Sequence, residues 1–203
     1  MQLDPRALAS TAVYKLLISS VVPRPIAWVS SVDANGVANL APFSYFMAIT
    51  DEPPTIAFSC SPRAGQRKDT LRNVEAIGEF VVNVVDDDRA EQMNLSSGDY
   101  PPETDEFALT NLTPVPSVVV KPPRVAEAPI NMECRVVRIL PVGKAHLTLG
   151  QIVQWHVRDD VYDEATGRLD MHRLRPVGRL TGNLYSHIHD IFEMKRPSEN
   201  YRG

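Results

Sequence analysis

The chain of 203 residues, 43% apolar and 23% charged, has the composition of an ordinary globular protein with one sizeable core. Its formal net charge of -4 and scattered Lys and Arg argue against a nucleic-acid-binding protein. No apolar run approaches the roughly 18 residues of a membrane-spanning helix. The first residues lack the pattern of a signal peptide, and Cys60 and Cys134 have no metal-type spacing. We therefore expect a cytoplasmic protein with reduced thiols, no membrane segment and no nucleic-acid partner.

Strands dominate the predicted elements, taken in chain order. IAWVSSV (26–32) is dense in β-branched and aromatic residues, and the Asn-Gly turn in DANG (33–36) leads into a second extended run through Phe46. Further strands are predicted at 55–60, 79–85, 130–142 and 145–162, and the last two form a long hairpin around Gly143.

Three short helices are predicted among these strands. In the segment 69–78, Asp69 or Thr70 caps the N-terminus and Gly78 ends the helix. Segments 87–97 and 105–111 give the other two. The 17 prolines cluster at segment edges, which is typical of short strands joined by stiff connections. The pattern predicts one mainly β domain over 1–203, most simply a barrel with short helical insertions and a C-terminal tail from about residue 187.

The common sequence signatures for phosphate binding and hydrolysis are absent. There is no G-x-G-x-x-G, no G-x-x-x-x-G-K-[ST] and no G-x-S-x-G, so neither a dinucleotide fingerprint, a P-loop nor a hydrolase elbow is present. The motif HIHD (187–190) suggests a metal, but its two histidines point the same way only on a strand and no third ligand is identified. We expect no metal site.

The segment SPRAGQRKDTLRN (61–73) joins a predicted strand to a predicted helix start, where free N–H groups and the helix dipole attract anions. Asp69 would repel a phosphate, so we interpret it as the helix cap or as a partner that orients Lys68 or an arginine. The alternative is a solvated basic loop before a capped helix. Side chains suited to phosphate gather here: Ser59, Ser61, Thr70, Arg63, Arg67 and Lys68.

The segment NLAPFSYF (39–46) has the composition of a strand edge that faces a flat, partly polar ligand. Ala41 and Ser44 are small, and Pro42 has no N–H to give to a sheet. The same composition suits an edge strand protected against aggregation. The residues alone leave the two interpretations equal.

Several other residues have both a structural and a functional interpretation. Trp28 and Phe46 could stack on a ligand, but aromatic residues at alternating strand positions are more often core. His156, on the late strand, and Tyr185, in GRLTGNLY, could reach a site or serve only in packing.

The chain resembles the flavin reductase-like family of FMN-binding split-barrel proteins. The similarity runs in order through VVPRPIAWVSSVDANGVANLAPFSYFMAIT, DEPPTIAFS, KDTLRN, EFVVNVV, SVVVKPPRVAEAPINMECRVVRI, LGQIVQWHV and RPVGRLTGNLY, over about residues 14–186. It implies a Greek-key split β-barrel that forms a homodimer, with FMN near the subunit interface. Isoalloxazine or ribityl contacts would come from Asn39, Ala41, Pro42 and Ser44. The phosphate would lie among Cys60, Ser61, Lys68, Asp69 and Thr70, with Arg63 and Arg67 beside it.

The resemblance also implies a reaction. The protein would transfer a hydride from NADH or NADPH to FMN and pass the electrons to a monooxygenase or another acceptor. Hydride transfer requires no acid–base group, so no catalytic side chain is expected. Two alternatives stay open: a flavoredoxin-like electron carrier with tightly held FMN, and a non-catalytic dimer of this fold.

Overall fold

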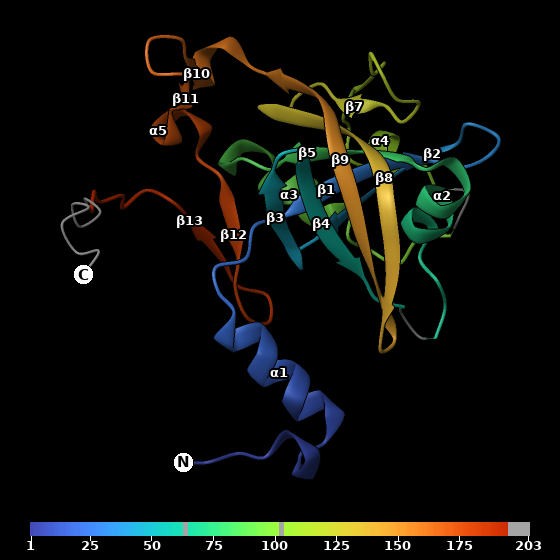
Figure 1. Ribbon diagram of the computed structural model, residues 1–203, viewed down its shortest axis with the longest axis vertical. Helices are drawn as coiled ribbons and strands as arrows, with labels where there is room; N and C mark the ends of the chain where they lie inside the picture. The colour runs from blue at the N-terminus through green and yellow to red at the C-terminus, as the bar shows by residue number, and fades with distance from the viewer. Residues whose placement is uncertain (63–64, 102–103, 195–203) are drawn as a thin grey trace.

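The computed structural model describes residues 1–62, 65–101 and 104–194, and its main feature is a seven-stranded antiparallel sheet (Figure 1). The order of strands across the sheet is β2-β1-β5-β8-β9-β4-β3. The mainly β prediction is therefore confirmed. The strands of this sheet are β1 (Ala27–Val32), β2 (Ala38–Phe43), β3 (Phe46–Asp51), β4 (Pro54–Cys60), β5 (Glu79–Val84), β8 (Ile130–Val142) and β9 (Ala145–Val157).

Shorter elements surround this sheet. The helices in the described ranges are α1 (Ser10–Ser20), α2 (Asp69–Ile77), α3 (Ala90–Leu95), α4 (Glu106–Leu109) and α5 (Met171–Leu174), with 3-10 turns at Pro5–Ala7, Asp87–Arg89 and Asp159–Val161. Two-stranded sheets pair β6 (Pro114–Val115) with β7 (Arg124–Val125), β10 (Tyr162–Asp163) with β11 (Arg168–Leu169), and β12 (Val177–Arg179) with β13 (Tyr185–His187). None of these helices has the length and apolar character needed to cross a membrane.

The large sheet curls, so that β2 and β4 approach each other although they are not neighbours in it. The ring centroids of Phe43 on β2 and Phe58 on β4 lie 5.1 Å apart, and Phe58 meets Phe80 of β5 at 5.3 Å. All three side chains are buried. A Cβ at Gly150 on β9 would lie 2.3 Å from Phe80 Cζ, so only glycine permits this packing. Aromatic contacts therefore fill the interior of the curled sheet.

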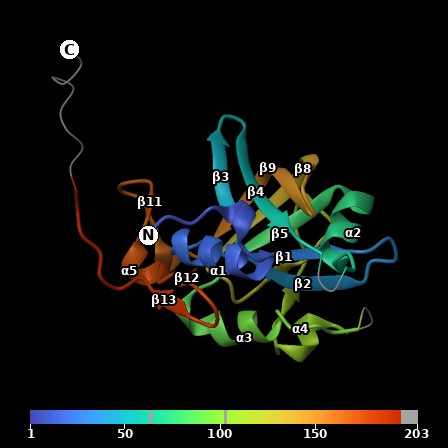
Figure 2. The same ribbon diagram turned by 90° about the horizontal axis from the view of Figure 1, so that it is seen from below.

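Both faces of β1 are buried because α3 and α4 cover its outer face (Figure 2). Val29 packs inside the curled sheet, whereas Trp28 packs on the other side with Met93 of α3 and Phe107 of α4. The indole N–H of Trp28 donates to Ser96 Oγ at 2.9 Å. Trp28 is thus a core residue, as the sequence favoured.

Two predicted boundaries were wrong. The extended run after DANG does not continue to Phe46, because β1 offers no partner beyond the pair of Ala27 with Phe43. The chain turns at Ser44, and β3 pairs instead with β4, Phe46 lying opposite Phe58. The long hairpin around Gly143 is confirmed by the pairing of β8 with β9, which has two register shifts. Its second strand was predicted to run to residue 162, but β9 ends at Val157.

Helix α2 begins where predicted but is not capped as predicted. Lys68, in an extended conformation, is the N-cap, and no side chain caps the helix. Asp69 and Thr70 are instead its first two residues. Gly78 ends the helix at φ 74°, the left-handed conformation that favours glycine, as expected. Helix α1, which the sequence reading did not find, projects from the sheet (Figure 1) and buries only Ile18.

Candidate functional site

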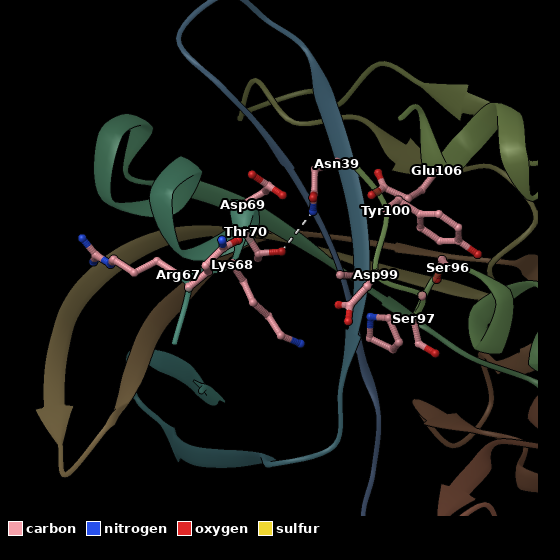
Figure 3. Close-up of a pocket in the computed structure, with 14 residues that line it drawn as sticks. Asn39, Arg67, Lys68, Asp69, Thr70, Ser96, Ser97, Asp99, Tyr100 and Glu106 are labelled. Atoms are coloured by element: carbon pink, nitrogen blue, oxygen red, sulfur yellow. Dashed lines mark hydrogen bonds between the residues drawn. The ribbon is translucent and has the colours of Figure 1, made fainter. Parts of the chain in front are cut away.

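The middle of β2 and the start of α2 meet at a surface hollow of about 160 Å³ (Figure 3). Asn39 Nδ2 donates to Thr70 Oγ1 at 3.0 Å and so joins the two elements directly. The walls of the hollow come from Asn39, Ala41 and Pro42, from residues 66–70 and 96–100, and from Glu106 of α4. This junction brings together the two segments that the sequence selected separately.

A larger hollow of about 780 Å³ adjoins the first, since Pro42 and Lys68 line both. Its walls include Ser44, Ser61 and Tyr14, the last from α1. A third hollow of about 370 Å³ shares Pro42, Ser44 and Lys68 with it. Small-molecule and cofactor sites commonly measure about 300–1,000 Å³. The three hollows together therefore offer a cofactor-sized site around the end of β2.

Lys68 is the cation that faces this site. Figure 3 shows its side chain directed into the hollow, and its ammonium lies 5.0 Å from the centroid of the Phe43 ring. Within the parts of the chain that the structure describes, Lys68 forms no ion pair. Arg67 also lines the hollow, but its guanidinium is directed away from it and pairs with Glu75. A positive charge thus lies at the start of α2 without an ion pair in the described ranges, although Asp99 and Glu106 line the same hollow.

Asp69 does not oppose an anion as strongly as its sequence position suggested. Its carboxylate pairs with Arg72 one helical turn later, which matches the interpretation of Asp69 as the partner of an arginine. The N–H groups of Leu71 and Arg72 both donate to Lys68 O, at 3.1 and 3.2 Å. In the described ranges, the N–H groups of Asp69 and Thr70 have no acceptor, so they are free to bind an anion.

Ser44 is held by an arginine that the sequence reading missed. Arg24 is buried, and its Nε donates to Ser44 Oγ at 3.5 Å. Its Nη1 donates to the carbonyls of Ile18 and Val21 at 2.6 and 2.7 Å, and its Nη2 donates to Leu180 O at 2.7 Å. Arg24 therefore fixes the end of α1 and the β12–β13 loop against the site. The sequence feature that could have identified Arg24 is its position between two prolines in VPRPIA.

Most of the predicted binding residues gather here. The first hollow is lined by Asn39, Ala41, Pro42, Lys68, Asp69 and Thr70, together with Arg67. The second is lined by Pro42, Ser44, Ser61 and Lys68. Arg63 lies outside the described residues.

Cys60 is placed differently from the other predicted residues. Its side chain packs in the core with Phe58 and lines none of the three hollows. Burial raises the pKa of its thiol to about 11, so the group is neutral at physiological pH. Only the backbone of Cys60 is left to contact a ligand in the site.

The loop 96–100 and Glu106 are further parts of the site that the sequence reading did not select. Glu106 accepts a hydrogen bond from the N–H of Leu40 at 3.2 Å, and burial raises the pKa of its carboxyl. These residues follow β2 by more than fifty positions, and no local pattern links them to it. Their contribution depends on the way α3 and α4 cover the sheet.

His156 has a structural partner rather than a place in the site. Its Nε2 lies 2.6 Å from Oε1 of the buried Glu133, and it lines none of the three hollows. Burial opposes ionisation of Glu133, yet its pKa is lowered because the N–H groups of Val118 and Val119, together with His156, stabilise the carboxylate.

Comparisons with known proteins agree with this architecture. The structure superposes with a TM-score of 0.92 on nitrilotriacetate monooxygenase component B from Bacillus cereus, with 38% identity and coverage of 96% of this chain and 98% of the other. The TM-score is 0.90 for 2-nitrobenzoate 2-nitroreductase from Pseudomonas fluorescens, with 31% identity and coverage of 98% of both chains.

The fold is that of a split barrel. A putative flavin reductase with a split barrel domain from Shewanella frigidimarina superposes with a TM-score of 0.85, 20% identity and coverage of 97% of this chain and 100% of the other. The family model described as "Flavin reductase like domain" matches residues 19–176, most of the chain. The chain is a member of the flavin reductase-like family.

Proposed function

We propose that this chain binds FMN at the junction of β2 and α2 and is an NAD(P)H-dependent flavin oxidoreductase. The observation that carries the proposal is the hydrogen bond between Asn39 and Thr70, with Lys68 beside it. It joins a strand edge suited to a flat ring system to a helix start suited to a phosphate. Membership of the flavin reductase-like family supports the choice of ligand.

The strand side of the site fits a planar ring. Ala41, Pro42 and Ser44 are half-buried and present short side chains toward the hollows. Pro42 lies opposite Trp28 in the β1–β2 pairing and has no N–H for a further strand. We infer that Asn39 and Ser44 hold the polar edge of the ring or the ribityl chain, with Arg24 positioning Ser44.

The helix side fits a phosphate. Two free N–H groups, a lysine without an ion pair in the described ranges, and the hydroxyls of Ser61 and Thr70 supply donors of the required kind. Asp69 is neutralised by Arg72. Cys60 would contribute through its backbone, and Arg67 would act only as a distant charge because Glu75 binds it.

The chain's own residues would bind and orient the flavin, and they would supply no proton for the hydride transfer. When bound, the flavin supplies the redox chemistry by accepting a hydride from NADH or NADPH. The nicotinamide would enter through the 780 Å³ hollow beside Tyr14 and Ser44, since the chain has no dinucleotide fingerprint. We assign no catalytic side chain.

Two partners belong to this proposal. Exposed apolar side chains of Leu17 and Val21 on and after α1, and of Tyr45 and Met47 beside β2 and β3, line an adjoining hollow of about 500 Å³. Such a surface next to the site supports a homodimer whose second copy completes the flavin pocket. The similarity to a monooxygenase component supports a monooxygenase as the electron acceptor.

Flavin binding and turnover test the proposal together. Flavin-free protein titrated with FMN should quench the flavin fluorescence with one FMN per chain, and the complex should oxidise NADH or NADPH. Activity that requires added FMN would indicate a reductase that releases its flavin. Flavin that survives dialysis and accepts no electrons from either nicotinamide would instead indicate an electron carrier. Absence of FMN binding would contradict the proposal.

A further inference from the structure

Three side chains with metal-binding atoms meet on the surface formed by β13 and the 3-10 turn at Asp87–Arg89. His187 Nδ1 lies 2.7 Å from Asp87 Oδ1, and His189 Nε2 lies 3.3 Å from Asp87 Oδ2. One ligand atom from each of the three residues lies within 4.8 Å of the other two. The sequence offered the two histidines but no third ligand, because Asp87 precedes them by 100 residues.

Backbone hydrogen bonds fix the segments that carry these three residues relative to one another. The Asp87 N–H donates to Arg175 O at 3.1 Å, and the Val177 N–H donates to Val85 O at 3.1 Å, so the segment around Asp87 is fixed to the start of β12. His187 then lies opposite Val177 in the β12–β13 pairing. Residue 189 follows β13 by two positions, and spacing of two places side chains on one face of an extended chain.

The arginines near Asp87 form ion pairs with other carboxylates. Arg175 pairs with Asp88 at 2.6 Å, and Arg158 is 2.5 Å from Asp160 and 3.7 Å from Asp86. Among the described residues, the side-chain ion pairs of the Asp87 carboxylate are those with the two histidines.

The two imidazoles are arranged as a pair. The His187 and His189 rings stack at 5.3 Å between centroids with an interplanar angle of 16°. Each presents a nitrogen to a different oxygen of the same carboxylate. The Asp87 side chain is 11% exposed, whereas those of His187 and His189 are 64% and 60% exposed. The cluster therefore combines a largely buried carboxylate with two exposed imidazole side chains.

We propose that Asp87, His187 and His189 bind one divalent transition-metal ion, and that Zn²⁺ fits them well. Zn²⁺ takes histidine nitrogens and carboxylate oxygens at about 2.0–2.2 Å in tetrahedral geometry, which separates neighbouring ligand atoms by about 3.4 Å. The nitrogen–oxygen separations of 2.7 and 3.3 Å in this cluster lie near that value. Three protein ligands leave a fourth position open to water, as in an accessible rather than a closed zinc site.

Such an ion would fasten the segment after β13 to the body of the protein. His189 has no place in a helix or strand, whereas Asp87 is fixed to Arg175 through its backbone. Binding would therefore link the extended C-terminal segment to the sheet that carries Tyr185, whose hydroxyl donates to Asn94 Oδ1 at 3.0 Å. Asp87, His187 and His189 line none of the hollows around Pro42 and Lys68, although Tyr185 of the same strand β13 lines the third of them.

Direct metal titration tests this site. Untagged full-length protein, stripped with a chelator, is titrated with Zn²⁺ in competition with a chromophoric chelator, and we expect one ion per chain. His189→Gln should weaken the affinity by at least about tenfold, since it removes one of three ligands from an exposed position without disturbing a strand. His172→Gln changes an exposed histidine of α5; it is the matched control and should bind as the parent does. The absorption spectrum of the Co²⁺-loaded protein supplies a second readout and should change with His189→Gln.

Three results would overturn the proposal. The first is that the parent protein takes up no stoichiometric Zn²⁺. The second is that His189→Gln and Asp87→Asn both retain parental affinity. The third is that His172→Gln lowers the affinity as much as His189→Gln does. Circular dichroism of each variant verifies that it is folded.

Discussion

Asn39 on β2 donates a hydrogen bond of 3.0 Å to Thr70 at the start of α2, although 31 residues separate them in the chain. This bond connects the strand edge and the helix start that make up the candidate flavin site. We expect Asn39→Ala to weaken FMN binding about three- to tenfold, since one hydrogen bond contributes about 0.5–1.5 kcal/mol. Fluorescence titration with FMN measures the change. Asn35→Ala, in the exposed β1–β2 turn, should bind FMN normally.

Lys68 should distinguish FMN from riboflavin. Because its ammonium faces the proposed phosphate position, Lys68→Met should lower FMN affinity by about ten- to a hundredfold and leave riboflavin affinity nearly unchanged, given about 1.5–3 kcal/mol for a charged hydrogen bond. Arg67→Met is the matched control, since Arg67 points away and pairs with Glu75. Equal losses for FMN and riboflavin would place the phosphate elsewhere.

Arg24 should matter for stability as well as for the site. Arg24→Met removes the donors to Ile18 O, Val21 O and Leu180 O and leaves these carbonyls without that partner. We expect the free energy of unfolding to fall by about 2–4 kcal/mol, as is usual when a buried hydrogen-bond network is broken. Urea unfolding measures the loss. A variant as stable as the parent would show that water replaces the guanidinium at low cost.

Glu133 should make the protein sensitive to acid. The pKa of its carboxyl is lowered in the folded state relative to its ordinary value of 4.5. Its contribution to stability is therefore complete above about pH 4.5 and is lost as the pH falls through the lower folded pKa. Glu133→Gln should be less stable at neutral pH and lose stability less steeply below pH 4.5. Urea unfolding of both proteins at several pH values provides the comparison, and parallel curves would contradict this assignment.

The sequence was sufficient for elements whose signals are local. The strands β1, β4 and β5 contain β-branched and aromatic residues, and Gly78 marks the end of α2, where the backbone is left-handed. The resemblance supplied the family and most of the residues that line the hollows. Elements that depend on distant partners were missed. The turn at Ser44 exists because β3 pairs with β4, and the exposed helix α1 carries almost no buried face to detect.

The residues of the candidate site likewise divide into those with a local sequence signal and those brought in by distant packing. Lys68 and Thr70 were predicted because they surround a helix start, and both line the first hollow, whereas alternation along β4 turns the side chain of Cys60 into the core. Arg24, Glu106 and the loop 96–100 reach the site only through the packing of α1, α3 and α4. Asp87 joins His187 and His189 for the same reason.

Anaerobic titration of the FMN-loaded protein with NADH, and separately with NADPH, tests the proposed function most directly. The account predicts that one of the two nicotinamides bleaches the visible absorption of the flavin with about one equivalent per flavin. Because Lys68→Met should bind FMN more weakly, this variant should need more added FMN to give the same loss of visible absorption. A flavin that stays fully oxidised with both nicotinamides would contradict the assignment as an NAD(P)H-dependent flavin oxidoreductase.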